Sequence, residues 1–404
     1  MTRAAKPPSD AILITGFPSQ EARAVLDQAL RDDDAARVFA LVPRGRAEGT
    51  NAMMESLDRA QAARVEVIEG DSRSIDLGLS GQRWRALAAE TSRIHLCHAL
   101  ASSNAGRKLA VEEVLRATDE VLELARATAK RSRVIAHSTA LVYGDRDGRF
   151  FEDDLDVGQH LRDGLVEANA RAEKMLRAQM GSLPITVVRP SIVVGDSVTG
   201  EIDRRLGSFG LFLLFVTAPP ELRLPSFGRS DARLNLVPID FVAQVAYAAG
   251  KHTGSISKTL HIVDRDPLPS RAVFELIAQA AGRRVNQGTL ASHLATALVR
   301  APGFERLGGS PRSLLDALVG DAVFDDQNAR ACAPHLSCPP LASYVGKIVE
   351  YVRASLGAAG PSAGPTNASR TDARTDARTD TRTDAHTDAR TDADPARRTE
   401  SSGV

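Results

Sequence analysis

The sequence of this 404-residue chain predicts an α/β fold built on a doubly wound parallel sheet. Short, continuous apolar runs are typical of strands buried on both faces, and here they alternate with stretches of helical periodicity. A turn containing glycine follows the first run, and 43% of the residues are apolar. This length and composition are enough for a full α/β domain, a smaller appended domain and a separate tail.

The first part of the chain contains four of the expected strands. Residues 1–10 are expected to form a loose leader, followed by a strand at 11–15 and a helix at about 20–30. Two more apolar runs, at 38–42 and 65–68, predict the second and third strands, and a fourth strand ends just before His98. A helix is expected from about 108 to 130.

The second part completes the predicted sheet and adds the smaller domain. A strand begins at Val134, a helix follows at about 165–176, and a further apolar run covers 184–195. The expected limits are 11–265 for the sheet domain, with a substrate-side insertion at 206–233, and 266–356 for a small, mostly helical C-terminal domain. Within these limits we expect a strand at 260–264 and helices at 270–281, 310–319 and 341–356.

The last segment, 357–404, has a different composition. Thr371 to Asp394 consists of six four-residue units on the theme T-D-A-R, with alternating charges and almost no apolar residues. Such a segment cannot bury enough apolar surface to offset its chain entropy. We therefore expect a disordered tail.

Charge, apolar runs and cysteine content limit the partners, location and metal content that the sequence predicts. The formal net charge is zero, so no global field attracts nucleic acid or an anionic membrane. The longest apolar run, at 211–216, is too short to cross a bilayer. The three cysteines form no close pair, which predicts a reducing, cytoplasmic location. Cys332 and Cys338 lack the neighbouring ligands of a zinc site, and the sequence predicts no metal cofactor.

The most informative motifs lie between residues 134 and 201. They read S-T-A-L-V-Y-G at 138–144, R-P-S-I-V-V-G at 189–195 and D-S-V-T-G-E at 196–201. On these motifs the chain resembles an extended short-chain dehydrogenase/reductase. Within that group it is similar to the NAD(P)-binding, male-sterility-type domains that reduce fatty acyl-CoA or carrier-bound thioesters. The resemblance covers residues 11–350 and implies a Rossmann-like fold.

The resemblance assigns catalysis to three positions, and only one is kept. Thr139 fills the Ser or Thr position, but the Tyr and Lys of the family's Tyr-x-x-x-Lys are replaced by Leu165 and Asn169. Tyr and Lys four residues apart share a helix face, where the ammonium lowers the phenol's pKa for proton exchange. Leu165 has no proton to donate, and Asn169 has no charge.

The cofactor turn is altered as well. In the family it reads T-G-x-T-G-F-L-G, and its glycines allow a tight turn and a close approach of phosphate. This chain places Thr15, Gly16, Ser19 and Ala22 at the corresponding conserved positions. Glu21 adds a carboxylate in the first helical turn, where it competes with an anionic ligand. The resemblance implies NADP or NAD as cofactor, and these changes predict weakened binding.

The remaining positions that the resemblance assigns to the cofactor are Arg44, Asp71, His98, Pro190 and Ser191. Arg44 is placed to meet a 2′-phosphate, or it is a solvated loop arginine. Asp71 is placed to contact adenine, or it is a turn aspartate. Leu100 is bulky where a small residue lets the cofactor pass.

Two tyrosines are alternative proton donors. Tyr143 follows the Thr139 strand, and its other interpretation is a tyrosine packed against the next helix. Tyr247 and Lys251 form a literal Tyr-x-x-x-Lys, but they follow the R-P-S-I-V-V-G strand, so we interpret them as a packing residue and a helix C-terminal cation.

Three functions remain open from the sequence. The first is a catalytically silent binding or regulatory protein on a reductase scaffold, whose ligand is an acyl-CoA, a carrier-bound acyl thioester or a protein partner. The second is an active NAD(P)H-dependent reductase of acyl thioesters with a non-standard proton donor. The third is a non-redox enzyme that uses the same cleft. The apolar segment at 206–227 suits an acyl chain and equally suits an oligomer contact.

Overall fold

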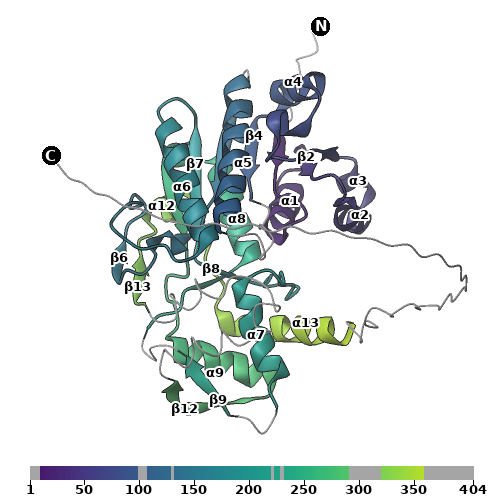
Figure 1. Cartoon of the computed structure of the whole chain (residues 1–404). Coiled ribbons are helices and arrows are strands. Elements are labelled where there is room, and N and C mark those ends of the chain that lie inside the picture. Colours follow the sequence, from purple (N-terminus) through teal and green to yellow (C-terminus); the bar gives the residue numbers. More distant parts are fainter. Residues whose placement is uncertain are drawn as a thin grey trace, which may run out of the picture. The chain divides into compact units, whose positions relative to one another are not determined.

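The main sheet of the structure, which is a computed structural model of the chain, has seven parallel strands (Figure 1). The structure describes residues 10–98, 107–128, 132–219, 223–227, 232–290 and 320–358. Leu100, the helix expected at 310–319, the leader up to residue 9 and the T-D-A-R tail lie outside the described residues.

The order of the strands confirms the doubly wound topology. Across the sheet they run β11, β7, β5, β4, β1, β2, β3, and every neighbouring pair is parallel. The chain therefore moves outward from β1 to β3 and then restarts on the other side at β4, which creates a switch point between β1 and β4. The strands are β1 (Ala11–Ile14), β2 (Arg37–Val42), β3 (Val65–Glu69), β4 (Arg93–Leu96), β5 (Arg133–His137), β7 (Ile185–Pro190) and β11 (Lys258–Ile262).

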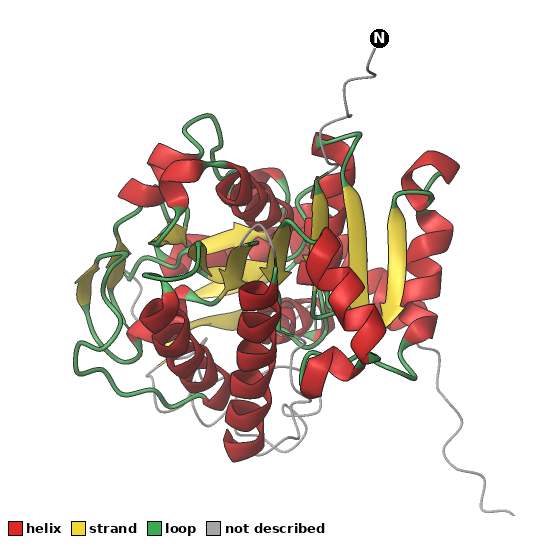
Figure 2. Ribbon diagram, turned by 90° about the horizontal axis from the view of Figure 1, so that it is seen from above, coloured by secondary structure: helices red, strands yellow, loops and turns green. Residues whose placement is uncertain are grey.

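Helices cover both faces of this sheet (Figure 2). One core cluster joins Ile12 and Ile14 of β1 to residues of α1 and α8, whereas Leu13 belongs to the cluster on the opposite face, with α4, α5 and α6. This alternation follows from the two-residue period of a strand. The helices are α1 (Gln20–Asp32), α4 (Gly81–Glu90), α5 (Arg107–Ala127), α6 (Gly164–Gln179) and α8 (Ile239–Lys251); α2 (Ala47–Ser56) and α3 (Arg59–Ala62) lie between β2 and β3 in the chain.

A separate hydrophobic core forms around α7. This helix is apolar on nearly every side. Its residues Phe209, Phe212 and Phe215 are buried because α9 and α13 pack against it. The elements that contribute are β8 (Ile192–Val194), α7 (Gly207–Thr217), β10 (Leu236–Pro238), α9 (Ser270–Ala281) and α13 (Val345–Ala358). Segments from both sides of residue 265 therefore build this core.

Three short parallel pairs complete the described part of the fold: β8 with β10, β9 (Arg223–Phe227) with β12 (Arg284–Leu290), and β6 (Gly148–Phe150) with β13 (Ala322–Phe324). The helix α12 (Gln327–Cys332) packs against β11 and α8. Residues 320–332, which follow α9 in the chain, thus lie beside elements of the main sheet.

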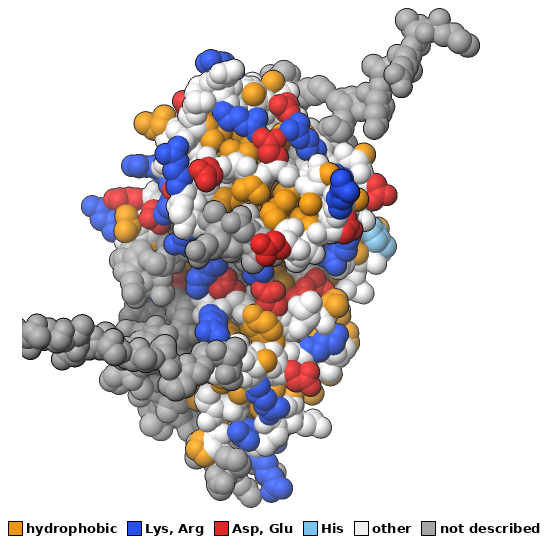
Figure 3. Space-filling view, turned by 90° about the vertical axis from the view of Figure 1, so that its right-hand side faces the viewer, with side chains coloured by type: hydrophobic (Ala, Val, Ile, Leu, Met, Phe, Trp, Pro, Cys, Tyr) orange, Lys and Arg blue, Asp and Glu red, His pale blue; other side chains and the backbone are white. Residues whose placement is uncertain are grey.

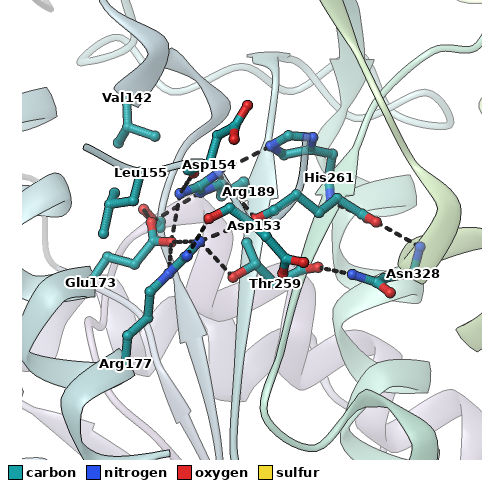
Figure 4. Close-up of polar contacts among 12 residues, drawn as sticks. Val142, Asp153, Asp154, Leu155, Glu173, Arg177, Arg189, Thr259, His261 and Asn328 are labelled. Atoms are coloured by element: carbon teal, nitrogen blue, oxygen red, sulfur yellow. Dashed lines mark hydrogen bonds and ion pairs between the residues drawn. The ribbon is translucent and has the colours of Figure 1, made fainter. Parts of the chain in front are cut away.

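A buried ion network attaches α6 to the sheet (Figure 4). Glu173 of α6 accepts hydrogen bonds from the Arg189 guanidinium of β7 at 2.7 and 3.0 Å, and both side chains are at most 2% exposed. Arg177, one turn further along α6, bonds the same carboxylate at 3.0 Å. Because Ser138 also donates to Glu173, at 3.2 Å, the network fixes which face of α6 is turned toward the end of β5.

The surface carries mixed charge. On the face shown in Figure 3, basic and acidic side chains are interspersed, with apolar side chains between them. Among the described residues, no helix has both the length and the apolar character needed to span a bilayer.

Candidate functional site

A cavity of about 210 Å³ opens at the carboxyl ends of the central strands. In a doubly wound sheet, ligands bind in this position. Its walls come from the starts of α1, α6 and α7 and from the segments after β4, β5 and β7. The lining residues that were predicted from the sequence are Ser19, His98, Thr139, Leu165, Asn169, Pro190 and Ser191.

Thr139 lies where the chain leaves β5 for a short 3-10 helix, η2 (Ala140–Tyr143). Its hydroxyl accepts the Leu141 N–H at 3.2 Å and lies 3.5 Å from the carbonyl oxygen of Pro190. The side chain is half-buried and lines the cavity. A hydroxyl held in this way can still contact a ligand in the cavity.

The helix α6 begins at the cavity with an aspartate cap. Asp163 Oδ1 accepts the N–H groups of Leu165 and Val166 at 2.8 and 3.2 Å. Its Oδ2 is buried in the same wall and has no hydrogen-bond partner in the described part of the chain. Asp163 was not predicted from the sequence, although an Asp directly before a helical pattern is a usual N-cap signal.

Leu165 and Asn169 both line the cavity, one helical turn apart. The Asn169 amide nitrogen donates to the Leu165 carbonyl oxygen at 3.0 Å. One of its N–H groups is therefore already bonded within the helix. Neither tyrosine nor lysine occurs among the described residues that line the cavity.

The alternative tyrosines lie elsewhere. Tyr143 is buried, and its ring packs against Phe150 and Phe324 with centroids 5.1 and 5.5 Å apart. Tyr247 is buried in α8 beside Arg93, whose guanidinium lies 4.8 Å from the ring centroid. Lys251 Nζ pairs with Asp32 at 2.6 Å.

The turn after β1 keeps its tight geometry. Gly16 has a φ of +86°, and a Cβ there would lie 2.5 Å from the carbonyl oxygen of Cys97. Thr15 Oγ1 donates to the same carbonyl at 2.8 Å. Ser19 caps α1, and its hydroxyl accepts the Ala22 N–H at 3.2 Å. One N–H of the first helical turn is therefore already bonded within the chain.

The other positions assigned to a cofactor are apart from this cavity. Arg44 is exposed. Asp71 is engaged by Arg73, with several hydrogen bonds of 2.9 to 3.2 Å. Burial raises the pKa of Asp71, but the hydrogen bonds and the positive charge of Arg73 lower it by more. The pKa of Asp71 therefore lies below its usual value. Neither residue lines the cavity, and nor do Thr15, Gly16 or Ala22.

A cluster of titratable groups at the cavity edge was not predicted from the sequence. His137, at the end of β5, contacts Glu21 Oε1 through Nδ1 at 3.0 Å and His95 Nδ1 through Nε2 at 3.2 Å. The Cys97 thiol lies beside them. Because these residues come from α1, β4 and β5, no sequence spacing reveals them.

Burial controls the protonation of His95, His98 and Cys97 at this edge of the cavity. It lowers the pKa of His95 well below the ordinary value and lowers that of His98 to about 4. Burial, with the nearby Glu21 charge, raises the pKa of the Cys97 thiol. These groups are held in their neutral forms near pH 7.

Sequence comparison places this chain in a known family. The model of the male sterility protein family matches residues 20–246, which is more than half of the chain. The chain belongs to this family. It is an extended short-chain dehydrogenase/reductase of the thioester-reductase type, as the motifs at 138–144 and 189–201 predicted.

Curated relatives of this male sterility family chain are much longer. A carboxylic acid reductase of Mycobacterium tuberculosis is 27% identical over 222 residues, covering 50% of this chain and 19% of that protein. A glycine betaine reductase of Emericella nidulans is 27% identical over 220 residues, covering 52% and 17%. The chain thus spans about a fifth or less of the curated relatives it matches.

Solved structures show the same fold. The terminal R domain of the myxalamid PKS-NRPS pathway superposes with a TM-score of 0.70 at 23% identity, covering 86% of this chain and 91% of that domain. The reductase domain of a nonribosomal peptide synthetase from Mycobacterium tuberculosis gives 0.67 at 21% identity, covering 87% and 93%. The structural similarity therefore extends beyond residues 20–246, the segment that the family model matches.

Proposed function

We propose that this chain binds an acyl thioester in the cavity beside Thr139 and does not reduce it by the usual tyrosine and lysine chemistry. It acts as a binding or regulatory protein on a reductase scaffold. The observation that carries the proposal is the pair Leu165 and Asn169, which occupy the cavity face of α6. Loss of a general acid typically costs a factor of about 10² to 10⁴ in rate.

The residues of the first turn do not fit a dinucleotide pyrophosphate. The Ser19 hydroxyl already takes the Ala22 N–H, and the Glu21 carboxylate lies in the first turn of α1. That carboxylate would repel a phosphate at the helix terminus that normally attracts it. Asp71, which the resemblance places at the adenine, is instead engaged by Arg73.

The cavity suits a ligand with both apolar and hydrogen-bonding parts. Leu141, Val166 and Ile192 provide apolar wall, and Asp163 Oδ2 provides a buried acceptor without a partner among the described groups. A buried acceptor of this kind gains most from a ligand N–H or O–H. The acyl chain and amide-containing arm of a thioester such as an acyl-CoA supply both features.

Ligand binding can be tested by thermal shift on the full chain with hexanoyl-CoA and, separately, with NADPH. We expect hexanoyl-CoA to raise the Tm, because the ligand binds only the folded state. NADPH is expected to give no shift up to millimolar concentration. Leu165→Trp should abolish the hexanoyl-CoA shift by filling the cavity. Arg171→Trp, on the exposed face of the same helix, should retain it.

Two outcomes would contradict the proposal. Absence of any shift with hexanoyl-CoA would exclude this class of acyl ligand. NADPH oxidation by the unaltered chain with hexanoyl-CoA, if abolished in Thr139→Ala, would instead support the alternative of an active NAD(P)H-dependent reductase with a non-standard proton donor.

A further inference from the structure

Three metal-ligating groups converge at the switch point between β1 and β4. They are the Glu21 carboxylate, the Cys97 thiol and the His137 imidazole, whose ligand atoms all lie within 4.8 Å of one another. Cys97 and His137 are buried, and Glu21 is half-buried in the cavity wall. They extend from two neighbouring parallel strands and from the helix above them, so the fold itself brings them together.

Their spacing suits a tetrahedral metal ion. Bonds of about 2.0 to 2.3 Å to nitrogen, oxygen and sulfur place neighbouring ligand atoms roughly 3.3 to 3.7 Å apart. His137 Nδ1 and Glu21 Oε1 are 3.0 Å apart, already close to this separation. The Cys97 sulfur lies within 4.8 Å of both atoms, so it would have to move closer by roughly an ångström to complete the set.

The surroundings support a cation. His137 Nε2 contacts His95 Nδ1 at 3.2 Å, and such an outer hydrogen bond commonly orients a metal-bound imidazole. The carboxylate and a thiolate bring two negative charges, which outweigh the partial positive charge at the start of α1. A bound metal removes the proton from a coordinating thiol.

We propose that Glu21, Cys97 and His137 form a site for a divalent transition metal of the zinc class. Because Glu21 and His137 both line the cavity, a ligand oxygen from the cavity would supply the fourth coordination position. Three protein ligands with one open position are typical of catalytic zinc sites. This inference goes beyond the proposed function, because it concerns cation binding and needs neither an acyl ligand nor NADPH.

Cobalt(II) is the direct probe, since a thiolate bound to it gives a near-ultraviolet charge-transfer band. We expect the full chain, with its thiols reduced, to bind one Co²⁺ and show this band together with the visible bands of a tetrahedral ion. Zn²⁺ should displace it. Cys97→Ser should lose the charge-transfer band, whereas Cys332→Ser and Cys338→Ser should keep it.

Two further variants keep the test decisive if Cys97→Ser does not fold. Glu21→Gln should weaken Co²⁺ binding at least tenfold while retaining the charge-transfer band. His95→Gln should weaken it by roughly 10- to 100-fold, as expected for an outer-shell partner. No band in the unaltered chain, a band that persists in Cys97→Ser, or an unchanged affinity in Glu21→Gln would each overturn the proposal.

Discussion

Single residues set the shape of the site at the turn between β1 and α1. Gly16 combines a positive φ with a close approach to the backbone of Cys97, the residue that follows β4. A side chain at this position would meet both a conformational penalty and a steric clash. Gly16 therefore determines how closely α1, with Glu21, approaches the end of β4 and Cys97.

Gly16→Ala should destabilise the chain by more than about 2 kcal/mol, because the clash with Cys97 adds to a left-handed penalty of roughly 1 to 2 kcal/mol. Gly45→Ala is the matched control. Gly45 also has a positive φ, +78°, but a Cβ there has no neighbour within 4 Å. Urea unfolding of both variants checks this, and equal losses would show that the Cys97 contact contributes nothing.

At the scale of elements, the placement of α6 depends on the buried carboxylate of Glu173. This group joins α6 to β7 through Arg189 and to the end of β5 through Ser138. The same helix presents Leu165 and Asn169 to the cavity. The register of α6 against the sheet thus decides which of its residues a ligand meets.

Glu173→Gln should lower the free energy of unfolding by about 3 to 5 kcal/mol, because it leaves the buried Arg189 guanidinium without a counter-charge. Lys174→Gln, on the exposed side of the same helix, breaks only the solvent-exposed pair with Asp156 and should cost less than about 1 kcal/mol. Denaturant unfolding compares them. Similar losses in the two variants would refute a structural role for the buried network.

At the scale of the whole molecule, Glu152 connects segments that are far apart in the sequence. Its carboxylate accepts N–H groups from His261 of β11 and from Asn328 and Ala329 at the start of α12, at 2.6 to 3.2 Å. Burial raises the pKa of Glu152 to about 7, although these three bonds oppose the shift. The contact therefore titrates near neutral pH.

The pH dependence follows from this raised pKa. The folded chain holds the Glu152 proton up to about pH 7, whereas the unfolded chain releases it near the usual glutamate pKa of 4.5. The stabilisation by the protonated group is thus complete below pH 4.5 and is lost as the pH rises to 7. The stability difference between the unaltered chain and Glu152→Gln should fall by about 1 to 3 kcal/mol over this window.

The difference in stability between the unaltered chain and Glu152→Gln excludes the titration of groups that both proteins share. His261 titrates in the opposite sense, since burial and Arg189 lower its pKa to about 3. Its effect rises with pH in both chains and cancels in the comparison. Urea unfolding at several pH values provides the data, and a stability difference that stays flat or grows with pH would contradict the assignment.

Local pattern identified most of the elements. The expected strands at 11–15, 38–42 and 65–68 match β1, β2 and β3 within a residue, and the helix expected at 270–281 matches α9. Continuous apolar runs and helical periodicity are local signals, so they can be read without knowing the neighbours. The motifs around Thr139 and Pro190 likewise indicated the family that sequence comparison then showed.

The sequence by itself determined the fold class and the family, because both follow from local patterns and from motifs of adjacent residues. The replacement of the Tyr and Lys positions by Leu165 and Asn169 stays a prediction. Only the tertiary structure decided which groups meet at the cavity. His137 and Glu21 are 116 positions apart, and parallel strands bring their ends together whatever the length of chain between them. For the same reason, the buried oxygen of Asp163 and the Glu152 contacts emerge only when distant segments pack.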